Sequence, residues 1–300
     1  MILLKFKSGI IIMKLRRSIV FQIKRLSSHS VKLLILACMS LITVGCNSDN
    51  AKTTNMDQQS NERVNTDWEN PEIFEINKLP ARASFFAYEN NRLASIGDKS
   101  QSKNFLSLNG KWKFNWVKTP SQRPVTFWQQ NYDASSWHSI NVPGNWERQG
   151  YGTPHYANIE YVFPANQPFI PHDYNPVGSY LKSFTLPDNW QEQQITIRLG
   201  AVNSAFYIWI NGKKVGYSQG SKLPAEFDAT PFVKSGVNKI ALEVYRWSDG
   251  SYLEDQDGWS LSGIERDVFL YATPKSHIKD LSVLSALVND FQDGQLNIDV

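Results

Sequence analysis

From Asn109 to Tyr271 the sequence alternates short apolar and aromatic runs with clusters of turn-forming residues, and this pattern constrains the fold more than any other feature. Several runs are apolar at every second position, which is the repeat of a half-buried β-strand. Asn211-Gly212 predicts a type I′ hairpin, because both central residues of that turn need a positive φ. The body has no long run with a helical repeat, apart from a short candidate near Ala81–Arg92. The predicted strands are Trp112–Val117, Tyr180–Leu186, Ile195–Leu199, Ala205–Ile210, Lys214–Tyr217, Lys239–Arg246 and Arg266–Tyr271.

Many short strands separated by turns predict an all-β fold, most simply an antiparallel jelly-roll sandwich. After Pro274 the pattern restarts, with candidate strands at Ile278–Leu287 and Leu296–Val300 joined at Asp293-Gly294. Two strands cannot bury the face of a sandwich by themselves. We therefore expect these strands either to be completed by a partner or to be the start of a truncated second sandwich.

The first 45 residues have the features of an export signal. They carry eight Lys or Arg and no Asp or Glu, and Val31–Val44 is an apolar run of signal-peptide length. The run ends in Thr43-Val44-Gly45-Cys46, which is similar to the lipobox of bacterial lipoproteins, although Thr43 stands where Leu is commoner. The similarity implies lipid attachment at Cys46, so we expect an exported, membrane-anchored lipoprotein in the periplasm or on the outer membrane. An ordinary secretory signal cut near Gly45 and an uncleaved membrane anchor are the alternatives.

Composition narrows the function of the remaining chain. Residues 46–66 are rich in Asn, Gln, Ser, Asp and Thr, which predicts a flexible tether. Without the eight leader cations, 23 basic residues stand against 28 acidic ones, and 23 − 28 gives a net charge of −5. A mildly acidic body with no basic stripe excludes nucleic acid as an expected partner. The only two cysteines, Cys38 and Cys46, precede the body, so we expect no disulfide and no cysteine metal site in it.

Longer motifs connect the body with a known family. Arg246–Asp267 reads RWSDGSYLEDQDGWSLSGIERD, and it resembles the corresponding stretch of the long bacterial β-galactosidases of glycoside hydrolase family 2. Other segments resemble this family in the same order, and the resemblance runs from about Asp67 to the end of the chain. The segments are DWENP (Asp67–Pro71), SLNGKWKF (Ser107–Phe114), VPGNWERQGYGTPHYAN (Val142–Asn158), GAVNSAFYIWINGKKVGYSQGSKLPAEFD (Gly200–Asp228) and GVNKIALEVYRWSDGSYLEDQD (Gly236–Asp257).

The resemblance implies a jelly-roll (galactose-binding-like) domain, then an immunoglobulin-like sandwich, then a barrel with two catalytic glutamates that hydrolyse terminal β-galactose residues with retention. The chain ends before a barrel, so we assign no catalytic residue here and expect it to be inactive alone. Magnesium is expected only in the full-length enzyme, because its ligands are absent from this chain. The expected domains are 1–45 (signal peptide), 46–66 (tether), 67–274 (jelly roll) and 275–300 (start of the immunoglobulin-like sandwich).

The resemblance also implies two binding residues. Asn158, at the end of a Tyr-x-Asn step, matches the family's substrate-binding Asn, and Asp257, the last acid of LEDQD, matches its substrate- and sodium-binding Asp. An amide can donate to and accept from a hydroxyl, and a carboxylate can accept from several hydroxyls at once. From spacing alone, a solvated acidic turn and a turn Asn are the simpler interpretations. Trp247 and Trp259 flank the acidic loop, either as walls of a pocket or as core residues.

Three functional hypotheses remain open. The chain is the sugar-binding portion of a β-galactosidase, or a lipid-anchored carbohydrate-binding module that does not cleave, or a fragment that complements another chain. The expected ligand is a β-galactoside such as lactose or a galactose-containing glycan. In the family, the arm that corresponds to Asp67–Arg92 lies near subunit contacts, which implies a homo-oligomer or complementation with the missing barrel region.

Overall fold

The computed structural model describes residues 3–6, 9–12, 66–158, 162–254 and 257–300. The apolar run of the predicted leader, Cys46 and nearly all of the predicted tether lie outside these described residues. The chain divides into two units, one with residues 64–281 and 300 and one with residues 1–63 and 282–299. None of the described helices is long and apolar enough to cross a bilayer.

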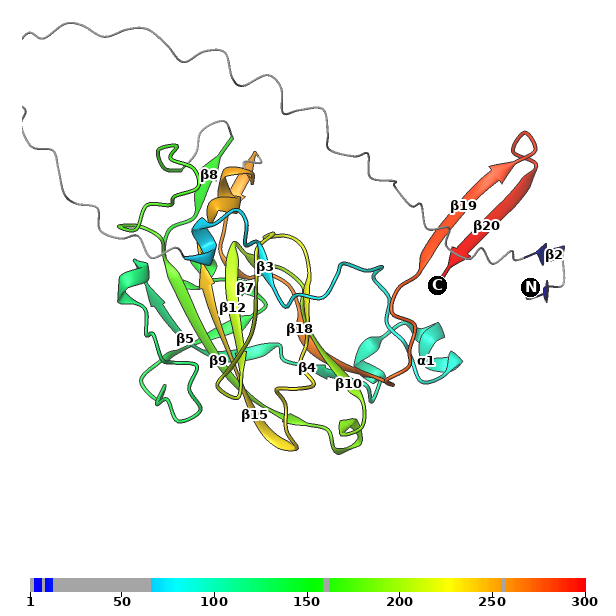
Figure 1. Ribbon diagram of the computed structural model, residues 1–300, viewed down its shortest axis with the longest axis horizontal. Helices are drawn as coiled ribbons and strands as arrows, with labels where there is room; N and C mark the ends of the chain where they lie inside the picture. Colours follow the sequence, from blue (N-terminus) through cyan, green and yellow to red (C-terminus); the bar gives the residue numbers. More distant parts are fainter. Residues whose placement is uncertain (1–2, 7–8, 13–65, 159–161, 255–256) are drawn as a thin grey trace, which may run out of the picture. The chain divides into compact units, whose positions relative to one another are not determined.

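Two antiparallel sheets form the larger unit (Figure 1). One has seven strands in the order β3-β13-β12-β15-β9-β5-β6, and the other has four in the order β14-β10-β18-β4. The predicted all-β sandwich is therefore confirmed. The bounds are β3 Glu75–Ile76, β13 Lys213–Ser218, β12 Ala205–Ile210, β15 Gly236–Tyr245, β9 Val177–Leu186, β5 Gly110–Val117, β6 His138–Val142, β14 Ala225–Asp228, β10 Gln194–Leu199, β18 Val268–Thr273 and β4 Phe105–Ser107.

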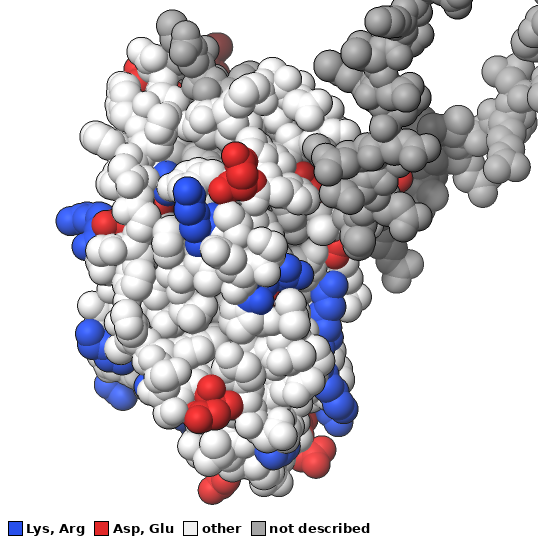
Figure 2. All heavy atoms as spheres, turned by 90° about the vertical axis from the view of Figure 1, so that its left-hand side faces the viewer, with Lys and Arg blue, Asp and Glu red and all other residues white. Residues whose placement is uncertain are grey.

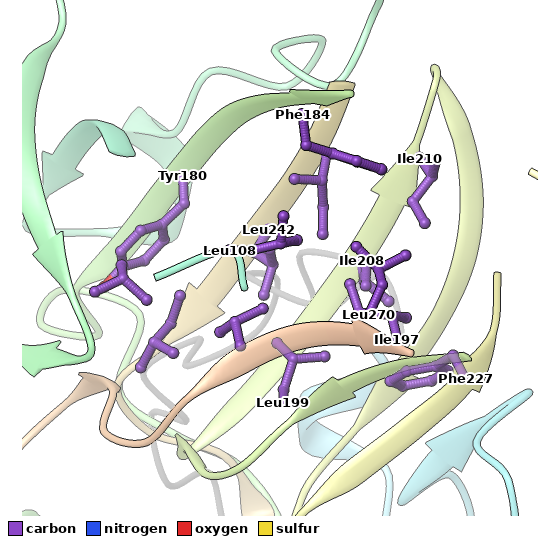
Figure 3. Close-up of a cluster of buried hydrophobic side chains, with 14 of the residues drawn as sticks. Leu108, Tyr180, Phe184, Ile197, Leu199, Ile208, Ile210, Phe227, Leu242 and Leu270 are labelled. Atoms are coloured by element: carbon purple, nitrogen blue, oxygen red, sulfur yellow. The ribbon is translucent and has the colours of Figure 1, made fainter. Parts of the chain in front are cut away.

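Side chains of the two sheets meet in one hydrophobic core (Figure 3). In β12, Phe206, Ile208 and Ile210 are buried, whereas Tyr207 and Trp209 between them are half-buried. This alternation follows from the two-residue repeat of a strand. Burial of each large apolar side chain stabilises the fold by roughly 1.5–3 kcal/mol. The core side chains labelled in Figure 3 include Tyr180, Phe184, Ile208, Ile210 and Leu242 from the larger sheet and Ile197, Leu199, Phe227 and Leu270 from the smaller one.

The turn between β12 and β13 has the predicted geometry. Asn211 has a φ of 51° and Gly212 a φ of 82°, so both central residues lie in the left-handed region that a type I′ turn requires. The side chain of Asn211 also donates to the backbone oxygen of Phe232 at 2.9 Å. Local sequence therefore determines this hairpin.

The predicted helix near Ala81–Arg92 is wrong in position. The chain forms no helix from Ala81 to Asn90, and α1 spans Asn91–Ile96. The helix begins there because the Asn90 side chain accepts a hydrogen bond from the Leu93 backbone nitrogen at 3.0 Å, and it ends at Gly97, which has a φ of 75°. An N-cap of this kind satisfies a donor that the first helical turn leaves free.

A buried ionic cluster holds the extended segment before α1 against the smaller sheet. Arg82 donates to both carboxylate oxygens of Glu226 on β14, at 2.8 and 2.9 Å, and Arg198 on β10 donates to the same carboxylate at 2.7 Å. Burial acts to raise the pKa of Glu226, but the hydrogen bonds and charges of the two arginines together outweigh it and lower the pKa. A carboxylate shared by two guanidinium groups thus fixes this segment in an extended path.

The smaller unit contains the hairpin of β19 (Ser282–Val288) and β20 (Asp293–Asp299). The predicted junction at Asp293-Gly294 is wrong, because both residues belong to β20. The turn lies at residues 289–292, where Asn289, Asp290 and Phe291 all have a positive φ. Short polar side chains tolerate this conformation through local hydrogen bonds, and the Asn289 amide donates to the Asp293 carboxylate at 2.5 Å.

The strand predicted from Ile278 also begins later, at Ser282. The Asp280 carboxylate accepts hydrogen bonds at 2.8 Å from the backbone nitrogens of Ala83 and Leu281, which ties residue 280 to the segment before α1 in the larger unit. In the smaller unit, β1 (Leu3–Phe6) pairs with β2 (Gly9–Ile12).

Short elements complete the larger unit. Two small sheets, β11-β17-β7 and β16-β8, lie outside the main pair. The bounds of these strands are β11 Val202–Asn203, β17 Gly263–Ile264, β7 Gly144–Asn145, β8 His155–Ala157 and β16 Gly258–Ser260, and 3₁₀ turns lie at Asp67–Glu69, Lys99–Gln101, Pro120–Gln122, Glu147–Gln149, Asp188–Trp190 and Asp249–Tyr252.

On the face shown in Figure 2, basic and acidic side chains of the described residues are scattered and form no continuous basic stripe.

Candidate functional site

The two predicted binding residues lie at the same end of the β8–β16 ribbon, which belongs to neither main sheet (Figure 1). Ala157 on β8 lies opposite Gly258 on β16. Asn158 directly follows Ala157, and Asp257 directly precedes Gly258. Opposed residues in an antiparallel ladder are about 4.5–5.5 Å apart between Cα atoms. The structure therefore brings residues 158 and 257 next to each other from distant parts of the sequence.

Tyr156 connects the two strands of the ribbon. Its hydroxyl donates a short hydrogen bond to Oδ1 of Asp257, and this bond raises the pKa of the phenol, so Tyr156 stays the donor. Its ring meets the Trp259 ring at 5.5 Å between centroids and at 69°. Alternation along β8 places Tyr156 and Asn158 on one face. Tyr156 thus orients the carboxylate on the face expected to carry the amide.

All four side chains of this group remain accessible. Tyr156 is 50% exposed and Trp259 is 63% exposed, and Asn158 and Asp257 are both exposed. Exposed Tyr and Trp beside polar side chains differ from the packed aromatics of the sandwich core. The ribbon therefore presents two aromatic rings, a carboxylate and an amide to a ligand.

A buried ion pair anchors the ribbon to the sandwich. The Arg246 guanidinium is 3.3 Å from the Glu147 carboxylate and donates to the Ser260 backbone oxygen at 3.4 Å. Glu147 also accepts from the Ser262 backbone nitrogen at 2.9 Å and from the Trp146 indole at 2.6 Å. Burial raises the pKa of Glu147 and lowers the pKa of Arg246, and their mutual attraction acts in the opposite direction in both cases. The pair thus fixes the chain where it leaves β16.

The other described acids of the loop have structural partners. The Asp249 carboxylate accepts from the Gln219 amide at 2.6 Å. The Glu254 carboxylate accepts from the Ser221 backbone nitrogen at 3.1 Å and from the Ser221 hydroxyl at 2.5 Å. These two acids therefore shape the loop that leads to Asp257, while Asp255 lies outside the described residues.

The chemistry of Asp257 suits a hard cation only in part. A carboxylate oxygen is the ligand type that such ions prefer. Within the described part of the chain, no group of three or more His, Cys, Asp and Glu side chains is gathered. Asp257 thus fits as one oxygen ligand of a sodium ion, and further oxygen donors would have to complete the coordination.

A cavity of about 400 Å³ lies beside the ribbon. Trp247 and Trp259 both line this cavity. From the sequence, either residue could have been a wall of a pocket or part of the core. They differ in burial, because Trp247 is 8% exposed and packs in a buried cluster. Tyr156 and Lys222 also belong to this region, although no sequence motif had indicated them. The Tyr-x-Asn step itself was the available signal for Tyr156, since residues two apart in a strand share a face.

Comparisons with known proteins identify the family of the domain that carries this ribbon. Residues 105–274 match the family described as "Glycosyl hydrolases family 2, sugar binding domain", and both Asn158 and Asp257 lie inside the match. The chain is 46% identical over 233 residues to a β-galactosidase of Priestia megaterium and 44% identical over 235 residues to one of Pectobacterium atrosepticum. These matches cover 76% and 78% of this chain and 22% of each relative.

Among solved structures, a Bacteroides uniformis β-glucuronidase matches 60% of this chain and 20% of its own, with 26% sequence identity and a TM-score of 0.47. The chain spans 22% of the length of the curated relatives described above. Because the family match extends over residues 105–274, more than half of the sequence, the chain belongs to glycosyl hydrolases family 2 and contains the sugar binding domain of that family.

Proposed function

We propose that this chain is the sugar-binding portion of a β-galactosidase and that Asn158 and Asp257 bind the terminal galactose of a β-galactoside. The observation that carries the proposal is the placement of both residues next to the same Ala157–Gly258 pair, inside the sugar binding domain. The similarity to β-galactosidases supports galactose as the sugar.

The proposed contacts use complementary hydrogen-bonding groups. A galactose ring presents hydroxyls that both donate and accept. The Asp257 carboxylate accepts from two hydroxyls or more, and the Asn158 amide donates to one and accepts from another. Because Tyr156 already donates to Asp257, it holds the carboxylate in place before the sugar arrives, which reduces the entropy lost on binding.

Bond cleavage is not assigned to any residue of this chain. Hydrolysis with retention needs an acid/base carboxyl and a nucleophilic carboxylate about 5–5.5 Å apart. We propose that polypeptide beyond these 300 residues supplies both groups, so that the complete protein hydrolyses terminal non-reducing β-galactose and this chain alone is inactive. In the complete protein Asp257 would also supply one oxygen ligand to sodium.

Isothermal titration of the chain with galactose and lactose tests the proposal. We expect weak, millimolar binding, because Asn158 and Asp257 contact one side of a sugar that binding sites normally enclose. Asp257→Asn should abolish it, whereas Asp133→Asn, a change of an exposed carboxylate before β6, should not. Equal binding by both variants would remove Asp257 from the site. Submicromolar lactose binding would instead favour a stand-alone carbohydrate-binding module.

Export and anchoring at Cys46 form a separate proposal that rests on the lipobox-like sequence. A Cys46→Ala variant should lose incorporation of a labelled fatty acid and leave the membrane fraction. Retention of the label in that variant would contradict lipid attachment at this residue.

A further inference from the structure

The outer face of the smaller sheet carries a polar and aromatic cluster beneath the segment that precedes α1. Arg198 on β10 lies between two cross-strand neighbours, Glu226 on β14 and Phe269 on β18. Its neighbours along β10, Ile197 and Leu199, belong to the core, so the two-residue repeat of the strand places Arg198 on the opposite face. A cavity of about 290 Å³ lies there and is called the Arg198 cavity below. Its lining includes Arg82, Phe85, Lys99, Arg198, Phe269 and Tyr271.

The two arginines of this cluster differ in how many of their N–H groups are used. Arg82 has an acceptor for each of its five N–H groups, namely both oxygens of Glu226, the Tyr271 hydroxyl and two backbone oxygens of its own segment. Arg198 donates from Nη1 to Glu226, and its Nε and Nη2 have no hydrogen-bond partner among the described residues. Its side chain is 18% exposed. Nε and Nη2 form one edge of the planar guanidinium, which matches the two oxygens of a carboxylate.

The cluster also carries more positive than negative charge. Arg82 and Arg198 share the single carboxylate of Glu226, whose side chain is 6% exposed. The Lys99 ammonium has its own carboxylate partner at 3.2 Å. Asp280 also interacts with Arg82, but it is exposed, so solvent and salt screen its charge. One guanidinium charge thus remains without a counterion inside the cluster, and a monoanion would offset it.

Flat apolar side chains form the rest of the wall. The rings of Phe269 and Tyr271 are 6.2 Å apart between centroids. The Arg82 guanidinium lies 4.9 Å from the centroid of the Phe85 ring and 5.5 Å from that of Tyr271. The volume of the cavity is near the lower end of the range for small-molecule sites. A ligand of about one ring would therefore fill it, whereas a small inorganic anion would leave the aromatic wall without a contact.

We propose that the Arg198 cavity binds a small carboxylate whose carboxyl group is attached to a flat apolar ring. The carboxylate accepts hydrogen bonds from Nε and Nη2 of Arg198, and the ring packs against the aromatic wall. The lining contains no residue of the β8–β16 ribbon. The inference is therefore independent of the proposed galactose site, and either can fail without the other.

Isothermal titration of the 300-residue chain with benzoate, benzamide and acetate tests the proposal. Benzoate should bind with a millimolar dissociation constant. Benzamide has the same shape but no charge, so its affinity should be about tenfold lower. Acetate has the charge but no ring, so its affinity should also be about tenfold lower.

Substitution of Arg198 locates the binding. Arg198→Met keeps an apolar stem and removes the guanidinium, and benzoate affinity should fall about tenfold. Because Glu226 keeps its two hydrogen bonds from Arg82, the variant should stay folded, which chemical denaturation checks. Arg198→Lys keeps the charge without the planar edge and should recover part of the affinity. The matched control is Arg148→Met, which changes an exposed arginine outside the cavity and should leave the affinity unchanged.

Each contrary result overturns a defined part of the proposal. Equal affinities for benzoate and benzamide would refute recognition of the carboxylate, and equal affinities for benzoate and acetate would refute the contact of the ring. Absence of benzoate binding at millimolar concentration would refute the site. These three results come from the unsubstituted chain and do not depend on the folding of a variant. A folded Arg198→Met protein with unchanged benzoate affinity would refute the assignment to this cavity.

Discussion

Phe227 in the sandwich core has no exposed surface, whereas Trp259 on the β8–β16 ribbon is 63% exposed. The core side chains contact one another across two long sheets, and the ribbon consists of two three-residue strands. The ribbon is anchored by the ion pair of Arg246 and Glu147 and by the hydrogen bonds of these two residues to the backbone of Ser260 and Ser262. The comparison indicates that the sandwich supplies stability and that the ribbon displays groups for binding.

Phe227→Ala should cause the largest loss of stability. The substitution leaves a cavity among packed side chains, so the free energy of unfolding should fall by about 3–5 kcal/mol. Chemical denaturation measures it. The matched control is Phe74→Ala, which changes an exposed Phe of the same unit and should alter stability by less than about 0.5 kcal/mol. Equal losses in the two variants would mean that this core does not carry the stability of the sandwich.

Glu147→Ala should affect both regions. It leaves the buried Arg246 guanidinium without its carboxylate, which should lower the free energy of unfolding by about 3 kcal/mol. Because the same residues hold Ser260 and Ser262, galactose binding should weaken as well. The double variant Glu147→Gln, Arg246→Met removes both charges and should recover most of the stability. A Glu147→Ala protein with unchanged galactose affinity would show that the anchor does not position the ribbon.

The elements that could be predicted from the sequence are those that neighbouring residues determine, and the others depend on contacts between particular side chains and the backbone. The long strands and the Asn211-Gly212 turn follow from alternation and backbone preference, which are local properties of the sequence. The helix near residue 90 was misplaced because the Asn90 cap, and not the propensity of the preceding residues, determines where it begins. The turn of the C-terminal hairpin was misplaced because Asn289 and Asp290 adopt a positive φ, which their short polar side chains tolerate, while Asp293 and Gly294 pair with β19 inside the ladder.

The site itself was only partly predictable. The family motifs pointed to Asn158 and Asp257, but strands of three residues are too short to show an alternating pattern, so the ribbon that unites them was not expected. Glu147 is hydrogen-bonded to Ser262, which is 115 residues away in the sequence, and no local sequence pattern indicates such a contact. Trp247 is buried and Trp259 is exposed, and their similar positions beside the same loop in the sequence do not indicate this difference.

Tyr156→Phe should have the smallest effect on stability. The side chain is half exposed, so the free energy of unfolding should change by less than about 0.5 kcal/mol. Galactose binding should nevertheless weaken about threefold, because Asp257 loses the hydroxyl that orients it. Titration with galactose measures the change, and Tyr132→Phe, in the loop before β6, is the control. An unchanged affinity would show that the ribbon does not preorganise the carboxylate.

The most direct measurement is a crystal structure of the chain soaked with galactose. One galactose ring should be bound, with hydroxyl oxygens within about 2.7–3.2 Å of both the Asn158 amide and the Asp257 carboxylate. A galactose ring bound elsewhere, or one that reaches only one of these two side chains, would contradict this expectation.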